Sequence, residues 1–165
     1  MKLICQYRRK DALLHAFTVI TAFIGFQAMA QTFDTGTETN ITSDTAYNET
    51  MYVGFVNPNN TVLIESNSTV SATKVIVGYL STNNTLTVES GSFLIAGGDA
   101  TTGGLTNGGV VVGYADGDAA LRINNSSTLN TEYLYVGLDA DDSGMVELAG
   151  DGTELNVFQD AEVGS

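Results

Sequence analysis

Apolar and polar residues alternate in short runs along most of the chain beyond residue 48. Gly, Asn, Asp and Ser, the residues that favour turns, separate one run from the next. Alternation with a period of two predicts strands that each bury one face, and no run beyond residue 30 has the period of an amphipathic helix. The pattern therefore predicts an all-β chain of short strands.

The runs are copies of one another. An apolar-Val-Gly unit recurs as MYVGF (51–55), VIVGY (75–79), VVVGY (110–114), LYVGL (134–138) and AEVGS (161–165). Its glycines, which mark the repeat, are Gly54, Gly78, Gly113, Gly137 and Gly164. Their separations of 24, 35, 24 and 27 residues indicate a 24-residue period with two insertions. Self-similarity at such a period is typical of a solenoid.

Each period holds three short strands and three turns, as expected for one coil of a right-handed parallel β-helix. We therefore predict about five coils of about 24 residues over residues 48–165, each paired with the next. A β-sandwich of hairpins is the competing fold. It needs regular Asn-Gly or Asp-Gly turns, and only Asp116-Gly117 and Asp151-Gly152 offer them.

Stacked coils place equivalent residues in columns. Three columns are predicted to point inward, the last of them as an aromatic stack: Met51/Val75/Val110/Leu134, Val53/Val77/Val112/Val136 and Phe55/Tyr79/Tyr114/Leu138. One apolar column is predicted to point outward, on a partly covered face: Tyr52/Ile76/Val111/Tyr135. The second strand should bury Val62, Leu86, Leu121 and Val146, and the third should pass through Val70, Leu94, Leu129 and Leu155.

Three segments fall outside the regular repeats. Residues 1–30 combine a basic start, an apolar run and an Ala28-Met29-Ala30 cleavage site, which together predict a signal-peptide helix and a mature start at Gln31. Residues 31–47 are polar and lack periodicity, so we expect a linker or a loose N-terminal cap. The Gly-rich stretch at about 97–109 is expected to project as an insertion loop.

Removal of residues 1–30 leaves a strongly acidic chain without cysteine. Residues 31–165 keep only Lys74 and Arg122 against 18 Asp and Glu, so their net charge is 2 − 18 = −16. Such a surface repels nucleic acid and attracts cations. Disulfides are excluded in the mature chain, and its apolar content predicts no transmembrane segment.

The unit 75–92 has the pattern Val-Gly-Tyr, a polar turn, then Asn-Asn-Thr-Leu-Thr-Val-Glu-Ser-Gly-Ser. It resembles the repeat of type V autotransporter passengers and of exported PEP-CTERM-associated proteins, over about residues 48–165. The resemblance implies a β-solenoid displayed at the outer membrane surface or outside the cell of a Gram-negative-type bacterium. It also implies further coils, or a translocator or anchor, beyond Ser165, because no capping repeat closes the open C-terminal end.

An acidic turn is the main candidate for a site. The run from Asp139 to Gly144 matches the start of a calcium loop, although the ligand expected at its twelfth position is a glycine. Stacking would gather up to five carboxylates here: Asp116, Asp118, Asp139, Asp141 and Asp142. A solvated acidic turn is the favoured interpretation, and calcium is the alternative. In the same column, Asn59 and Asn83 precede Asp118 and Asp142.

No catalytic residue and no other cofactor is predicted. Residues 31–165 have no His or Cys, and Lys74 and Arg122 belong to different coils. We therefore expect a non-catalytic structural or adhesive passenger, an adhesin that holds loops and an acidic edge toward a host or cell-surface glycan or protein. The alternative is the N-terminal part of a carbohydrate-active β-helix, an enzyme or a carbohydrate binder, whose functional residues lie beyond Ser165.

Overall fold

The structure, a computed structural model, describes residues 30–97, 108–115, 118–138 and 142–164. These residues form only strands and turns, so the all-β prediction is confirmed. The strands are β1 (Gln31–Phe33), β2 (Glu38–Ile41), β3 (Thr45–Val53), β4 (Thr61–Ile64), β5 (Thr69–Val77), β6 (Asn84–Val88), β7 (Phe93–Ala96), β8 (Gly109–Val112), β9 (Asp118–Asn124), β10 (Thr128–Val136), β11 (Ser143–Ala149) and β12 (Glu154–Val163).

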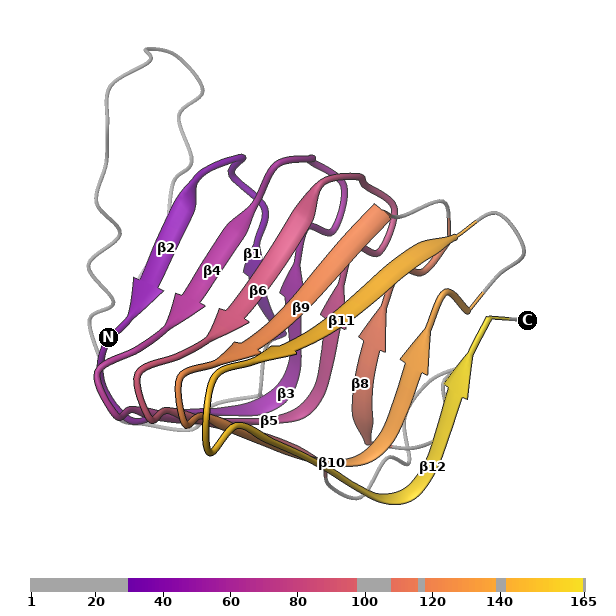
Figure 1. Cartoon of the computed structure of the whole chain (residues 1–165). Helices are drawn as coiled ribbons and strands as arrows, with labels where there is room; N and C mark the ends of the chain where they lie inside the picture. The colour runs from indigo at the N-terminus through magenta and orange to yellow at the C-terminus, as the bar shows by residue number, and fades with distance from the viewer. Residues whose placement is uncertain (1–29, 98–107, 116–117, 139–141, 165) are drawn as a thin grey trace, which may run out of the picture.

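The strands stack into two sheets that face each other across the core (Figure 1). One sheet has the order β1-β3-β5-β7-β10-β12, with β8 also between β5 and β10, and the other has the order β11-β9-β6-β4-β2. Every neighbouring pair is parallel, for example Met51 opposite Val75. The predicted parallel β-solenoid is confirmed. From Val53 to Val163 it makes about four turns of about 25 residues, and a shorter turn precedes them.

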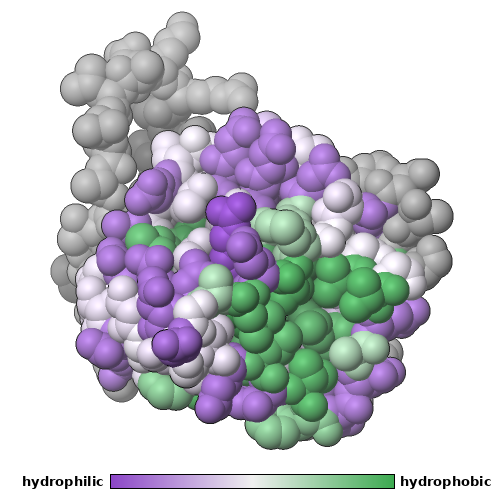
Figure 2. Space-filling model, viewed as in Figure 1, coloured by the Kyte–Doolittle hydropathy of each residue, from purple (hydrophilic) through white to green (hydrophobic). Residues whose placement is uncertain are grey.

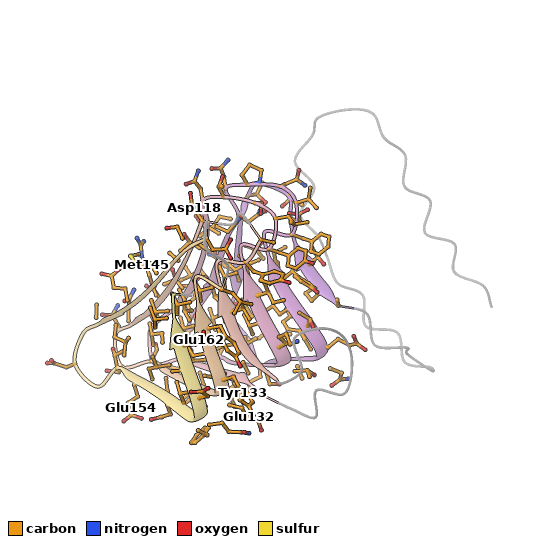
Figure 3. All side chains as sticks on the ribbon, turned by 90° about the vertical axis from the view of Figure 1, so that its right-hand side faces the viewer. Asp118, Glu132, Tyr133, Met145, Glu154 and Glu162 are labelled. Carbon is orange, nitrogen blue, oxygen red and sulfur yellow. The ribbon has the colours of Figure 1, made fainter. Side chains whose placement is uncertain are left out.

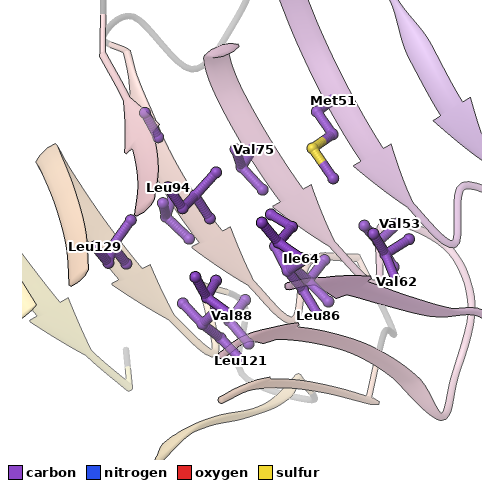
Figure 4. Packing of buried hydrophobic residues seen from close by; sticks show 14 of the residues in the cluster. Met51, Val53, Val62, Ile64, Val75, Leu86, Val88, Leu94, Leu121 and Leu129 are labelled. Atoms are coloured by element: carbon purple, nitrogen blue, oxygen red, sulfur yellow. The ribbon is translucent and has the colours of Figure 1, made fainter. Parts of the chain in front are cut away.

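The two aliphatic inward columns of the first strand are as predicted. Met51, Val75 and Val110 are fully buried and lie opposite one another on successive coils. The column of the second strand continues the same core through Val62, Leu86 and Leu121. Figure 4 shows Met51 and Val75 of the first column and Val62, Leu86 and Leu121 of the second meeting between the two sheets. Burial of each aliphatic side chain stabilises the fold by about 1.5–3 kcal/mol, and its neighbours above and below provide the contacts.

The repeat glycines all have a left-handed backbone, with φ of 77°, 69°, 77°, 65° and 71° in chain order. They end the first strand of each coil at a corner, in a backbone conformation that L-residues rarely adopt. At Gly78 a Cβ would also lie 2.8 Å from the Cβ of Ala119. Both backbone conformation and space therefore require glycine at this corner.

The aromatic residues after these glycines do form a stack, but the predicted inward direction is wrong. Phe55, Tyr79 and Tyr114 are only half-buried. Phe55 and Tyr79 both contact Tyr52, which points away from the core between Met51 and Val53. The left-handed glycine interrupts the in-out alternation of the strand, so the residue after it falls on the outer side.

The outward apolar column is partly covered, as expected. Ile76 and Val111 in its middle are only 3% and 2% exposed, whereas Tyr52 and Tyr135 at its two ends are half-exposed.

The N-terminal segment 31–47 is part of the solenoid, which corrects the expectation of a linker or loose cap. β1 pairs with the second half of β3, and β2 pairs with β4. The Asp34 Oδ1 atom accepts hydrogen bonds from the backbone N–H groups of Phe55, Val56 and Asn57, at 2.9, 3.0 and 2.7 Å. Backbone pairing and this carboxylate hold the segment in place, although its sequence has no hydrophobic pattern.

One corner of the coil varies in length. A single residue, Thr73, separates the two halves of β5, while the neighbouring coil has Asn48 and Glu49 at this place. In the next coil, twelve residues, 97–108, lie between β7 and β8, yet Ala96 and Gly109 keep their partners on β5 and β10. The segment predicted as an insertion therefore lies between two strands that keep their pairing. Most of the loop itself lies outside the described residues.

The predicted signal peptide also lies outside the described part, apart from Ala30. Among the residues that the structure describes, no helix is long and apolar enough to cross a membrane.

Candidate functional surfaces

The acidic turn is described only in part. Asp118 is exposed at the start of β9, and Asp142 is half-buried just before β11. Asp142 Oδ2 accepts a hydrogen bond of 3.1 Å from the backbone N–H of Ala115 on the coil below. Asp116, Asp139 and Asp141 lie outside the described residues. Within the described ranges no group of three or more His, Cys, Asp or Glu side chains gathers, so calcium at this turn stays a prediction.

The register of the last coil also changes the predicted Asn-to-Asp column. Ser143, and not Asp142, lies opposite Asp118. The cause is one extra residue between Gly137 and Val146, compared with the coils before it. The extra residue lets the carboxylate of Asp142 reach back toward Ala115. Asp142 thus joins two coils at this turn.

A buried asparagine ladder lies one residue further along the same edge, at Asn60 and Asn84. Asn84 Oδ1 accepts from the backbone N and from Nδ2 of Asn60, at 3.1 and 2.9 Å. Asn84 Nδ2 donates to the carbonyl and to the hydroxyl oxygen of Ser81, at 3.0 and 2.9 Å. Asn59 and Asn83 are instead exposed, with the left-handed backbone that asparagine tolerates. The sequence prediction therefore chose the exposed member of each Asn-Asn pair.

A serine column closes the turn after the second strand. Ser68, Ser92 and Ser127 are buried. The backbone N–H of Ser68 donates to Ser92 Oγ, and that of Ser92 donates to Ser127 Oγ, both at 3.2 Å. The sequence prediction missed this column. The signal was available, because Ser68 and Ser92 are one 24-residue period apart.

An aromatic strip of four side chains lies on the outer side of the described coils: Tyr52, Phe55, Tyr79 and Tyr114. Phe55 and Tyr79 stack at 5.0 Å with an interplanar angle of 1°, and Tyr114 follows at 5.0 Å and 35°. Tyr52 packs its ring edge-to-face on Phe55, at 5.0 Å. Burial, followed by the neighbouring Tyr79, raises the pKa of Tyr52. The strip is therefore a stacked aromatic surface on an acidic molecule.

The outer side of the last strand is acidic. Glu154, Asp160 and Glu162 are exposed on β12, and Figure 3 shows Glu154 and Glu162 at the end of the solenoid that faces the viewer. Burial raises the pKa of Tyr135 on β10, and the charges of Asp160 and Glu162 raise it further. This face therefore carries a negative potential.

The two cations of residues 31–165 have different surroundings. Lys74 is buried on β5, and burial lowers the pKa of its ammonium group. Arg122 on β9 is half-exposed, and its Nε lies 3.2 Å from Glu147 Oε2 on β11. Nothing in the described structure brings the two cations to one site.

Comparisons with known proteins give no relative for this chain: no family model, no curated protein and no solved structure matches it.

Proposed function

We propose that the chain is an exported, non-catalytic β-solenoid scaffold that acts as an adhesive passenger of the autotransporter or PEP-CTERM-associated type. The outer aromatic strip is the observation that carries this proposal. Four aromatic side chains from three successive coils form one surface, and exposed Val56 and Leu80 lie next to them in the sequence. Contiguous exposed apolar surface is typical of interaction sites.

The geometry of the strip favours a protein partner over a glycan. Sugars bind aromatic residues by covering a free ring face. Both faces of Tyr79 are already covered, by Phe55 on one side and Tyr114 on the other. The ring edges and phenol groups that remain suit an apolar protein surface with hydrogen-bond acceptors. The glycan partner, and the carbohydrate-active alternative, therefore receive less support from this surface.

Hydrogen bonds of buried polar side chains between coils support the scaffold role. The asparagine ladder and the serine column both connect one coil to the next. Asp34 connects the first coil to the second in the same way. These contacts stiffen a column that can hold a surface away from a membrane.

Two measurements test the proposal. Expression of the full chain in a Gram-negative host should give an exported product that begins at Gln31 by mass spectrometry. The purified product should adhere to immobilised cell-surface proteins, and the Phe55→Ser/Tyr79→Ser variant should lose most of that adhesion. The control Phe93→Ser changes an exposed aromatic residue outside the strip. Retention in the cytoplasm, or equal adhesion by both variants, contradicts the proposal.

A further inference from the structure

The aromatic strip contains three neighbouring tyrosines. Tyr79 and Tyr114 lie on successive coils, and their ring centroids are 5.0 Å apart with an interplanar angle of 35°. Tyr52 meets Tyr79 edge-to-face, at 5.9 Å. Of the tyrosine ring pairs in the part of the chain that the structure describes, Tyr79 and Tyr114 are therefore the closest.

The backbone of the two coils fixes this pair. The N–H of Tyr114 donates to the carbonyl of Gly78, and the N–H of Tyr79 donates to the carbonyl of Gly54, both at 2.9 Å. The residues before the two tyrosines, Gly78 and Gly113, have nearly the same left-handed φ, 69° and 77°. Both side chains therefore leave the corner in the same direction. Because the ring planes are tilted, they converge toward one edge of the pair.

The rest of the strip directs oxidation chemistry to this pair. Phe55 covers the other face of Tyr79, at 5.0 Å and 1°, and a phenylalanine ring has no phenol from which a radical can form. Tyr79 and Tyr114 are only half-buried, so a part of each side chain reaches solvent. The two phenols can thus be oxidised, and each has the other as its nearest tyrosine.

A covalent link at this place would constrain a long stretch of chain. Residues 31–165 have no cysteine, so no disulfide can join the coils. Tyr79 and Tyr114 are 114 − 79 = 35 residues apart, the longest spacing between equivalent residues of successive coils. A cross-link restricts the unfolded chain, and its effect grows with the number of residues between the joined positions. This pair therefore lies where one link stabilises the solenoid most.

The charge of the molecule favours a link within one chain over a link between chains. Residues 31–165 carry a net charge of 2 − 18 = −16, and like-charged copies repel each other. Figure 2 shows that hydrophilic residues dominate the surface over β2 and β4. The ring of a second copy must approach against this repulsion, whereas the partner ring in the same chain is already 5.0 Å away.

We propose that Tyr79 and Tyr114 form an oxidative cross-linking site, at which a dityrosine bond joins two successive coils when the chain meets hydrogen peroxide and a haem peroxidase. The site depends on the geometry of the strip and not on its adhesive role.

The reaction balances as follows in atoms and electrons. Hydrogen peroxide, acting through the peroxidase, takes one electron and one proton from each phenol and is reduced to two water molecules. The unpaired electron of each phenoxyl radical is shared with the ring carbons ortho to the oxygen. A carbon–carbon bond forms between a Cε atom of Tyr79 and a Cε atom of Tyr114. Each of these carbons then passes its proton to its own phenol oxygen, so the product has lost two hydrogen atoms.

Peptide mapping of the oxidised full chain tests the site. Cleavage after Glu65, Glu89 and Glu132 places Tyr79 and Tyr114 in two separate peptides that contain one tyrosine each. After treatment of a dilute sample with hydrogen peroxide and a haem peroxidase, the monomer should yield these two peptides joined, with the mass of two hydrogen atoms lost and the blue fluorescence of dityrosine. A small photochemical oxidant, ruthenium tris(bipyridine) with persulfate, serves as a second reagent that is not limited by enzyme access. Absence of the joined peptides with both reagents overturns the proposal.

Conservative variants identify the partners. Tyr114→Phe keeps the ring but removes the phenol, and should abolish the joined peptides. Tyr52→Phe and Tyr133→Phe are the matched controls, since both residues also have a tyrosine ring as neighbour, at 5.9 and 6.3 Å. Both controls should retain the link between Tyr79 and Tyr114. Persistence of the link in Tyr114→Phe, or a main product that joins Tyr52 to Tyr79, contradicts this pair.

The melting temperature tests the consequence for the scaffold. The oxidised parent chain should melt at least about 5 °C above the untreated chain, because the link restricts the unfolded state. The oxidised Tyr114→Phe variant should show no such rise. An equal rise in this variant, or a fall in the linked parent chain, would refute reinforcement by this bond.

Discussion

Replacement of Asn84 by alanine tests whether the buried asparagine ladder holds the coils together. The Asn84 side chain makes four hydrogen bonds, two with Asn60 and two with Ser81, and it is only 1% exposed. Without it, the buried backbone N–H of Asn60 loses the acceptor shown here. An orphaned buried donor costs about 1–3 kcal/mol, and each of the other bonds contributes about 0.5–1.5 kcal/mol.

We therefore expect Asn84→Ala to lower the free energy of unfolding by about 3–5 kcal/mol. At about 3 °C per kcal/mol for a domain of this size, the melting temperature should fall by about 10 °C or more. Urea unfolding followed by far-UV circular dichroism measures the free energy, and calorimetry measures the melting temperature.

The matched control is Asn130→Ala. Asn156 Nδ2 donates to Asn130 Oδ1 at 3.0 Å, so this pair also joins two coils, but it lies half-buried on the outer face. Water can replace this bond, and its loss should cost no more than about 1 kcal/mol. If Asn84→Ala and Asn130→Ala have equal effects, or if Asn84→Ala costs less than about 1 kcal/mol, burial of the ladder does not have the role we assign to it.

Three further perturbations separate backbone, charge and metal effects. Gly78→Ala should lower the free energy of unfolding by about 2–3 kcal/mol, because its φ of 69° and a close methyl group both oppose a side chain. Gly164→Ala, with a φ of 71° and open space around it, should lower it by only about 1 kcal/mol, as measured by urea unfolding. Equal losses for the two variants would contradict the contribution of the close methyl group. Because the pKa of Tyr52 is raised in the folded chain, its contribution to stability is complete below about pH 10 and is lost as the pH rises through the folded-state value. Tyr52→Phe should therefore lose less stability than the parent chain between neutral and strongly alkaline pH, and an equal loss refutes this assignment. Calcium at the acidic turn should raise the melting temperature, a chelator should reverse the rise, and Asp118→Asn/Asp142→Asn should abolish it; a melting temperature independent of calcium leaves a solvated acidic turn.

The repeat could be predicted because two simple signals agree in the coils from residue 48 onward. Period-two alternation identified the buried columns through Val75 and Leu86, and the glycine spacing fixed which residues lie opposite one another. Stacking translates a spacing in sequence directly into a position in space. This is why the fold, the strand order and the place of the insertion followed from the sequence.

The errors arose where backbone geometry or polar contacts decide the structure. A left-handed glycine changes the side on which Tyr79 lies, and alternation alone contains no information about φ. Asn84 and Ser92 point inward although they are polar, because partners on adjacent coils satisfy them. Segment 31–47 joins the sheets through backbone pairing and Asp34, which leave no hydrophobic pattern. A comparison of polar residues one period apart would have found the Asn and Ser ladders.

The same corner interrupts β3, β5, β10 and β12 by one or two residues and separates β7 from β8 by twelve, while the strands on both sides keep their partners. The number of residues in a coil is therefore independent of the distance that the coil adds along the axis. A gene that gains codons at this corner lengthens the chain without lengthening the column. Residues can be inserted at this corner in any coil while the distance between the two ends of the solenoid stays the same.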